Sequence, residues 1–148
     1  MDALRLLMDD HRRVQDLFKR IDDATTDREQ LFRQVAQELR VHAGIEEAFL
    51  YPAVKQALRD RVEESLEEHH QYEMVIDDLA QISPSNPDWQ GKFNALKEDV
   101  NHHIKDEETE LFPKTRQLLS EEQLEELGQR MEDQKASTDE KAGAHRRH

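Results

Sequence analysis

Two eleven-residue segments of this chain carry the same kinds of side chain at the same offsets. HAGIEEAFLYP (42–52) and HIKDEETELFP (103–113) share a histidine, a Glu-Glu pair, an aromatic residue and a proline. In each segment a glutamate follows the histidine by four residues, which places both side chains on one face of a helix. Imidazole and carboxylate groups held in this way can bind a metal ion. The repeat therefore predicts a metal site built from two similar halves.

The candidate ligands are ionisable residues in the middle of four helical stripes that are apolar at both ends. They are His11, His42, Glu46, His69, Glu73, His103 and Glu107. In an antiparallel bundle the middles of the helices lie at similar heights, so these side chains should meet in one layer of the core. Three buried carboxylates without positive partners would cost roughly the 5–15 kcal/mol that holds a domain together. No Lys or Arg falls at the centre of a stripe, so we expect metal ions there.

The donor types and their number restrict the metal. The chain has no cysteine, and nitrogen and oxygen donors together suit iron, manganese or zinc. Seven ligands are too many for one tetrahedral zinc and about right for two ions that share bridging carboxylates. If Glu46 and Glu107 bridge, the second half supplies one ligand more, because it has Glu73 where the first half has Gln15. The ion of the first half should then keep an open position for an exogenous ligand.

Two histidine doublets leave alternative ligands open. We prefer His69 to His70 and His103 to His102, because the preferred residues continue their stripes and have a glutamate four residues later. The glutamates that directly follow the two bridging candidates are expected to be solvated or in surface ion pairs: Glu47 and Glu108.

Four long helices must position these residues. The apolar spacing and the capping signals predict helices over about 2–22, from Thr26 to Pro52, from Asp60 to the breaker at 83–88, and from Pro87 to Pro113. Each helix with a terminal proline should end or bend there. A short fifth helix should run from Ser120 to about Met131.

These elements predict an all-α fold. The expected architecture is an up-down-up-down antiparallel four-helix bundle with a short extra C-terminal helix. Residues 1–134 are predicted to form one domain, and residues 135–148 a flexible polar tail.

Charge and hydropathy exclude some partners. The formal net charge of −13 argues against a nucleic acid, which needs a clustered basic surface. No stretch approaches about 18 apolar residues, so no membrane partner is expected. The first residues lack a basic segment followed by an apolar run, which favours a cytoplasmic location. No segment of the sequence indicates a protein partner.

The assembled motifs resemble those of hemerythrin-like proteins, the HHE cation-binding domain, over about residues 3–116. They are the early Asp10-His11, the two segments that end LYP and LFP, and Glu68-His69. The resemblance implies a non-haem di-iron centre in a four-helix bundle, with O₂ bound at the iron that has fewer protein ligands. It also implies iron ligands at His11, His42, His69 and His103, and bridging carboxylates at Glu46 and Glu107.

The sequence departs from oxygen-carrying hemerythrins at two positions. Those proteins have a histidine where this chain has Glu73, and their second bridge is an aspartate five residues after its histidine, whereas Glu107 follows by four. The pattern is closer to bacterial and regulatory members, whose roles include iron or oxygen sensing, peroxide or nitric oxide responses and metal storage.

Three functions are therefore weighed. The first is a di-iron protein that binds or senses O₂ or a related small ligand. The second is an enzyme that acts on peroxide or nitric oxide at the same centre, and the sequence leaves open whether the protein is an enzyme. The third is a structural or storage metal site. No catalytic residue outside the ligand set and no organic cofactor motif is found.

Overall fold

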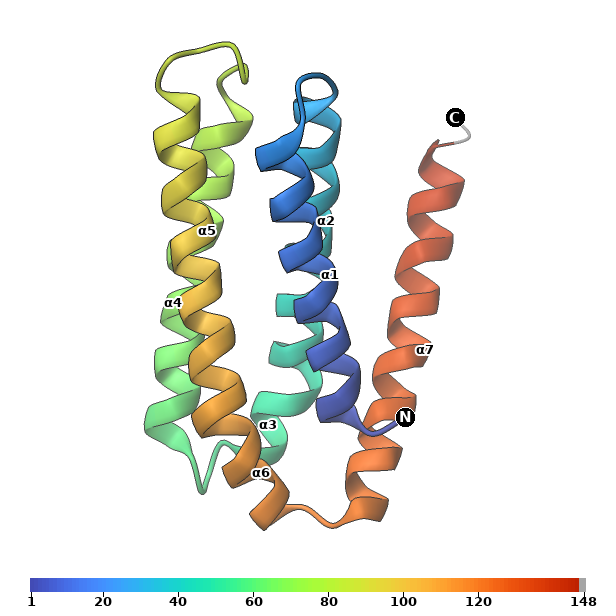
Figure 1. Cartoon of the computed structure of the whole chain (residues 1–148). Helices are drawn as coiled ribbons and strands as arrows, with labels where there is room; N and C mark the ends of the chain where they lie inside the picture. The colour runs from blue at the N-terminus through green and yellow to red at the C-terminus, as the bar shows by residue number, and fades with distance from the viewer. Residues whose placement is uncertain (147–148) are drawn as a thin grey trace.

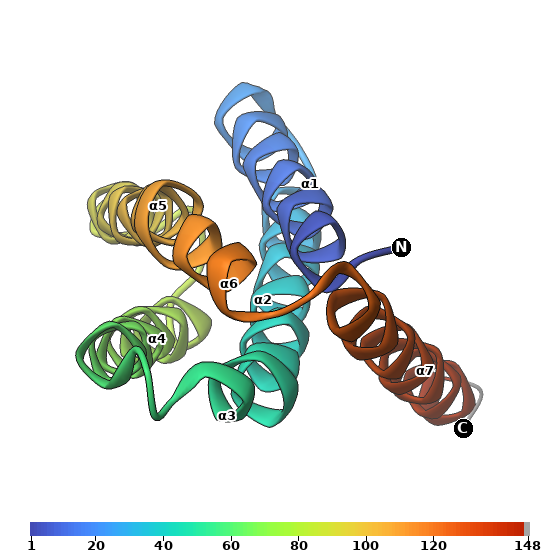
Figure 2. The same cartoon turned by 90° about the horizontal axis from the view of Figure 1, so that it is seen from below.

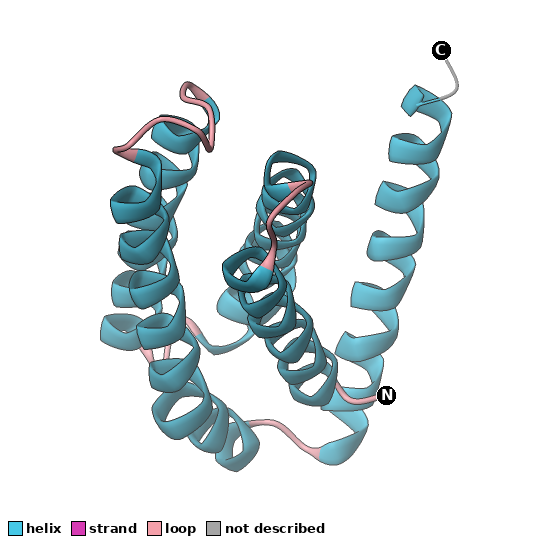
Figure 3. Cartoon of the chain, turned by 45° about the horizontal axis from the view of Figure 1, so that its top comes forward, coloured by secondary structure: helices cyan, strands magenta, loops and turns pink. Residues whose placement is uncertain are grey.

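The computed structural model describes the backbone of residues 1–146 and the side chains of residues 1–138. Within that range all regular structure is helical (Figure 3), which confirms the predicted all-α class. The elements are α1 (Ala3–Asp23), α2 (Arg28–Ile45), the π-helical turn η1 (Glu46–Leu50), α3 (Tyr51–Val54), α4 (Arg59–Ala80), α5 (Trp89–Asp106), the π-helical turn η2 (Glu107–Leu111), α6 (Phe112–Leu118) and α7 (Glu121–Arg146).

The long helices are arranged as two pairs. Helices α1 and α2 lie side by side, as do α4 and α5, and the loops that join each pair lie at the same end of the molecule (Figure 1). Seen from below, the two pairs face each other, and α7 lies outside them against α1 (Figure 2). In the described range, no helix is both long and apolar enough to cross a membrane.

Local hydrogen bonds explain where several helices begin. The side chain of Asp2 accepts a hydrogen bond from the backbone N–H of Arg5 at 2.8 Å and caps α1. Ser120 and Gln123 exchange the two reciprocal hydrogen bonds of a capping box before α7, as predicted. The capping box predicted at Thr26 is not used. Helix α2 instead begins after Asp27, which has a φ of 62° and forms no side-chain cap.

Pro52 and Pro113 each follow a π-helical turn and lie in the first turn of the helix that comes after it. The π-helical turns η1 and η2 each start at a bridging candidate, and Pro52 and Pro113 follow in α3 and α6. The backbone N–H of Tyr51 donates to the carbonyl of Glu46, five residues earlier. A proline is tolerated in the first turn of a helix, because the N–H it lacks is not needed there. A π-helical turn thus precedes each of these prolines, where the sequence predicted an end or a bend; such turns are common at functional sites.

The apolar core consists of two clusters with a polar layer between them. One cluster includes Phe18 and Phe93 and lies toward the loops that join the helix pairs. The other includes Leu50 and Leu111 and lies toward α3 and α6. Helix α7 completes the second cluster with three side chains: Leu124, Leu127 and Met131. The histidine and glutamate side chains between these clusters are shielded from water on both sides.

Helix α7 is longer than predicted. The sequence indicated a helix to about Met131, but the helix continues to Arg146, through most of the predicted polar tail. Residues 147 and 148 lie outside the described range.

Gly128 allows α7 to pack closely against the start of α1. A Cβ atom there would lie 2.1 Å from the carbonyl oxygen of Met1, whereas one at Gly91 would meet nothing within 4 Å. Alanine is favoured over glycine inside a helix by about 1 kcal/mol. We therefore expect Gly128→Ala to lower the melting temperature and Gly91→Ala to leave it unchanged or raise it, as measured by circular dichroism. Equal effects of the two substitutions would contradict this packing.

Candidate metal centre

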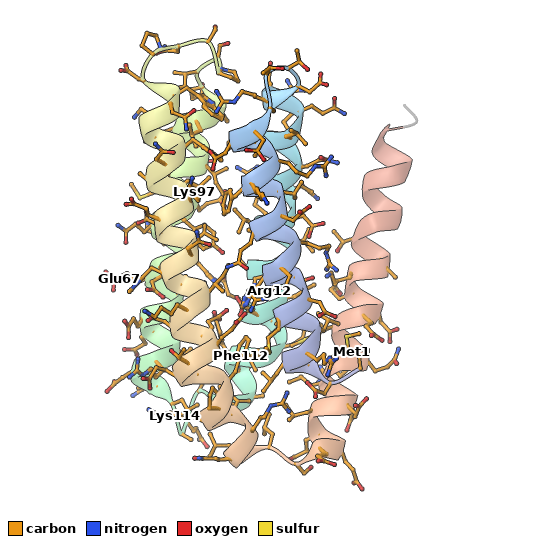
Figure 4. All side chains as sticks on the ribbon, viewed as in Figure 1. Met1, Arg12, Glu67, Lys97, Phe112 and Lys114 are labelled. Carbon is orange, nitrogen blue, oxygen red and sulfur yellow. The ribbon has the colours of Figure 1, made fainter. Side chains whose placement is uncertain are left out.

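Six of the seven predicted ligands meet in the layer between the two apolar clusters. They are His11, His42, Glu46, His69, His103 and Glu107, and none is more than 5% exposed. They come from α1, α2, η1, α4, α5 and η2, so both helix pairs contribute. Two residues labelled in Figure 4 mark the edge of this layer: Arg12 donates a hydrogen bond to Glu108, and the ring of Phe112 stacks on that of His11 at 5.8 Å.

The six side chains form two overlapping groups. One contains His11 and His42, the other contains His69 and His103, and Glu46 and Glu107 belong to both. In each group the potential ligand atoms all lie within 4.8 Å of one another. Two sites that share two carboxylates have the arrangement of a carboxylate-bridged pair of metal ions.

The Nε2 atoms of the histidines face the shared carboxylates. Oε1 of Glu46 lies 3.2 Å from Nε2 of His42 and 3.0 Å from Nε2 of His69. Oε1 of Glu107 lies 3.1 Å from Nε2 of His11, and its Oε2 lies 3.5 Å from Nε2 of His103. Each glutamate thus contacts a histidine of both groups.

The Nδ1 atoms of all four histidines donate hydrogen bonds outward to carboxylates. The pairs are His11 to Glu108 at 2.6 Å, His42 to Asp10 at 2.9 Å, His69 to Glu47 at 3.0 Å and His103 to Glu68 at 2.8 Å. Such a partner fixes the tautomer and the ring orientation of a metal-binding histidine, and leaves Nε2 available for the ion.

These outer carboxylates have a role that was not predicted from the sequence. Glu47 and Glu108 were expected to be solvated or in surface ion pairs; Glu47 is 46% exposed and Glu108 pairs with Arg12, but each also orients a histidine of the opposite helix pair. Asp10 and Glu68 act within their own pair, and Asp10 also accepts hydrogen bonds from Arg13 and Lys135. The sequence did contain the signal: each outer carboxylate directly precedes or follows a candidate ligand, as in the Asp-His, Glu-His and Glu-Glu doublets.

The buried charges shift the pKa values of these groups strongly. Burial alone would lower the pKa of His103, but the carboxylates of Glu107, Glu46 and Glu68 raise it to about 10. The pKa of His42 is raised well above its usual value against the effect of burial, chiefly by the charge of Glu46. Burial would raise the pKa of Glu46, yet the charge of His42 holds it well below its usual range. Without metal, protonated imidazoles therefore compensate the buried carboxylates.

The donor set fits a metal ion. Nε2 of His42 and Oε2 of Glu46 are buried and have no hydrogen-bond partner among the described residues. Unpaired buried polar atoms are costly, and a cation between them would satisfy both. Imidazole and carboxylate donors without sulfur suit iron, manganese or zinc.

Glu73, the seventh predicted ligand, does not join either group in this structure. Its carboxylate is 39% exposed and accepts a hydrogen bond from Arg40 at 2.8 Å. Helix α4 buries Ser65, His69 and Tyr72, so the interior position after His69 is three residues on and Glu73 lies at the edge. As the side chains stand, each group has two histidines and the two shared glutamates, so the groups are equal in potential protein ligands.

The structure also distinguishes between the members of the histidine doublets. His69 and His103 lie in the buried layer, whereas His70 is exposed and the side chain of His102 is 66% exposed. His102 lies at the surface near Glu68 and Asp106.

Two tyrosines, Tyr51 and Tyr72, border the site, although no sequence motif assigned them to it. The hydroxyl of Tyr51 donates to Oε2 of Glu107 at 2.8 Å and lies 3.2 Å from Nε2 of His69. Tyr72 lies with its ring 5.5 Å from that of His69, and its hydroxyl is buried without a hydrogen-bond partner in the part of the chain whose side chains are described. Burial, together with the charges of Glu46 and Glu107, raises the pKa of both phenols well above the usual value, so both stay protonated hydrogen-bond donors.

Comparison with known proteins identifies the class. The sequence profile described as Hemerythrin HHE cation binding domain matches residues 2–115. The chain belongs to this family, as the motifs indicated.

Two relatives differ in how much of their length they share with this chain. A crystal structure of a hemerythrin HHE cation binding domain-containing protein from Mycobacterium kansasii superposes with a TM-score of 0.82 at 27% identity, over 93% of this chain and 89% of that one. A protein of Nostoc sp. (strain PCC 7120), described as a DNA nickase, is 30% identical over 128 residues. That match covers 84% of this chain but 36% of the relative.

The raised pKa of His103 predicts a pH-dependent stability for metal-free protein. A histidine whose pKa rises from 6.5 to about 10 on folding stabilises the fold fully below pH 6.5, and this contribution is lost as the pH approaches 10. We expect the melting temperature of chelator-treated protein to fall across this window. Metal-loaded protein should change less, because its imidazoles are already neutral. Equal pH profiles of the two forms would contradict the assignment.

Removing an outer carboxylate should weaken metal binding. We expect Glu68→Ala to lower the affinity roughly 10–100-fold, because the ring of His103 loses the hydrogen bond that orients it. Competition with a chromophoric chelator measures this affinity. Glu67→Ala, next to it on the exposed face and directed away from the bundle in Figure 4, is the matched control. A loss of affinity in both variants would indicate a general electrostatic effect.

Proposed function

We propose that this protein holds a non-haem, carboxylate-bridged di-iron centre and binds O₂ or a related small ligand there, as an oxygen- or iron-binding or sensing protein. The observation that carries the proposal is the sharing of Glu46 and Glu107 between two histidine pairs. His11 and His42 would hold one iron, His69 and His103 the other, and the shared carboxylates would bridge. Membership of a cation-binding family supports this assignment.

The choice of iron rests on the kind of ligand. Four imidazoles and two carboxylates suit several metals, but a buried pair of ions with mixed nitrogen and oxygen ligands is suited to redox chemistry with O₂. When bound, the di-iron centre would supply the electrons that O₂ needs. The protein would supply orientation through the Nδ1 hydrogen bonds and shielding from water through the two apolar clusters. The proposal includes the up-down-up-down arrangement of the four long helices, which the short loops within each pair support.

Peroxide turnover is a second candidate with an observation in its favour. The Tyr51 hydroxyl lies against Glu107 and His69 and can donate a hydrogen bond within the centre. An assay of O₂ release from peroxide would distinguish turnover from simple binding.

We do not propose DNA nicking, the activity in the description of the Nostoc relative, for this chain. The shared part covers 36% of that protein, and a net charge of −13 would repel a phosphate backbone. The cytoplasmic location stays a prediction.

Metal analysis tests the proposal. We expect two irons per chain, with absorption of an oxo-bridged pair that changes reversibly between the reduced and the aerated protein. Glu46→Gln should lower the iron content, because a bridge is weakened, whereas Glu73→Gln should retain both irons. Iron content below one per chain in protein purified without chelator would overturn the di-iron assignment. Loss of iron in Glu73→Gln would restore Glu73 as a ligand.

A further inference from the structure

A groove of about 360 Å³ opens between α2 and α4 beside one end of the centre. Ala43 and Gly44 line it on α2, and His69 and Tyr72 line it on α4. A Cβ atom at Gly44 would meet nothing within 4 Å, so this wall has free space. The groove therefore reaches from the surface to a side chain of the candidate metal site.

Tyr72 places an unused hydrogen-bond donor next to this groove. The residue is 1% exposed, and its hydroxyl has no hydrogen-bond partner among the described residues. Its ring centroid lies 5.5 Å from that of His69 and 6.0 Å from that of His103. An unpaired buried hydroxyl costs free energy, so a partner that enters the site would be favoured.

The other half of the molecule provides an internal comparison. By the sequence repeat, Ala43 and Gly44 correspond to Ile104 and Lys105, and Tyr72 corresponds to Val14. The equivalent path, between α1 and α5 at the His11 end of the centre, therefore has larger side chains, with Val14 in the place of the tyrosine.

The α1–α5 path is also crossed by polar contacts. Arg12 donates to both Gln15 and Glu108 between α1 and η2, and Gln15 donates to Asn101 at 3.4 Å. At the groove the pair that corresponds to Asn101 and Gln15 in the repeat, Arg40 and Glu73, likewise joins α2 to α4, whereas the exposed His70 stands at the position equivalent to Arg12. The ion pair of Arg40 and Glu73 keeps a carboxylate away from the His69–His103 end and leaves room there.

We propose that a hydrogen-bond-accepting ligand of two or three atoms enters through the α2–α4 groove and binds at the His69–His103 end of the centre. There the hydroxyl of Tyr72 donates a hydrogen bond to it. This inference rests on the proposed metal centre, and it places the ligand at the opposite end from the one that the sequence alone indicated.

Azide, a three-atom hydrogen-bond acceptor, is the probe for the hydroxyl. In iron-loaded protein we expect Tyr72→Phe to raise the azide Kd roughly tenfold, measured by absorption titration, with the iron content unchanged. The melting temperature of ligand-free protein should not fall, because the hydroxyl has no hydrogen-bond partner among residues 1–138 to lose. An unchanged Kd would show that Tyr72 does not meet the ligand.

Gly44→Leu is the probe for the path. Leucine is favoured over glycine in a helix, and a Cβ atom at Gly44 meets nothing within 4 Å, so the variant should fold with its side chain in the groove. We expect both the association and the dissociation rate of azide to fall several-fold in stopped-flow measurements, with a smaller change in Kd, because entry and exit share one path. Gly91→Leu is the matched control, because a Cβ atom at Gly91 also meets nothing within 4 Å and this glycine lies away from the groove. Equal rates in the two variants would exclude this path.

The outcomes separate the inference from the proposed function. Wild-type protein that takes up no iron overturns the metal centre and this inference with it. Iron-loaded protein that binds azide equally well in all variants overturns the inference alone. A structure of the azide complex with the ligand beside His11 would also overturn it.

Discussion

The burial of two carboxylates side by side is the constraint on which the rest of this structure depends. Glu46 and Glu107 are at most 1% exposed and lie between two apolar clusters, where charges interact more strongly than in water. Such groups need compensating positive charge, from protons on the imidazoles or from metal ions. The four histidines provide the binding atoms for either, and the outer carboxylates keep the rings turned so that Nε2 faces inward.

The same constraint accounts for the repeated motif. In each copy the histidine points inward and the first glutamate is shared between the two groups. The second glutamate crosses to a histidine of the other helix pair. The π-helical turn begins at the first glutamate, and the aromatic residue and the proline follow it. The contacts of Glu47 and Glu108 join the two helix pairs through polar groups as well as apolar packing, so the site also helps to hold the pairs together.

The two halves differ in ways that matter for chemistry, but in other residues than the sequence indicated. Gln15 and Glu73 both lie outside the metal-binding groups. The difference lies in the aromatic shell, where Tyr51 and Tyr72 stand opposite Phe112 and Val14 in the repeat. Hydroxyl groups are therefore concentrated at the His69–His103 end, next to a groove that reaches the surface.

The sequence by itself determined the helical class, the family and six side chains of the central layer, because helical periodicity and the spacing of ligands along one helix are local properties. The sequence did not indicate the end of α7 because, beyond Met131, that helix has no apolar stripe to mark it, although its Ala, Glu, Lys and Gln residues favour helix.

Only the tertiary structure decided the position of Glu73, the partners of the outer carboxylates and the groove. Each depends on how far a helix is rotated against its neighbours, and a change of one residue in the buried position moves a side chain by about 100° around the helix axis. For α4 that rotation buries Tyr72 and leaves Glu73 at the edge.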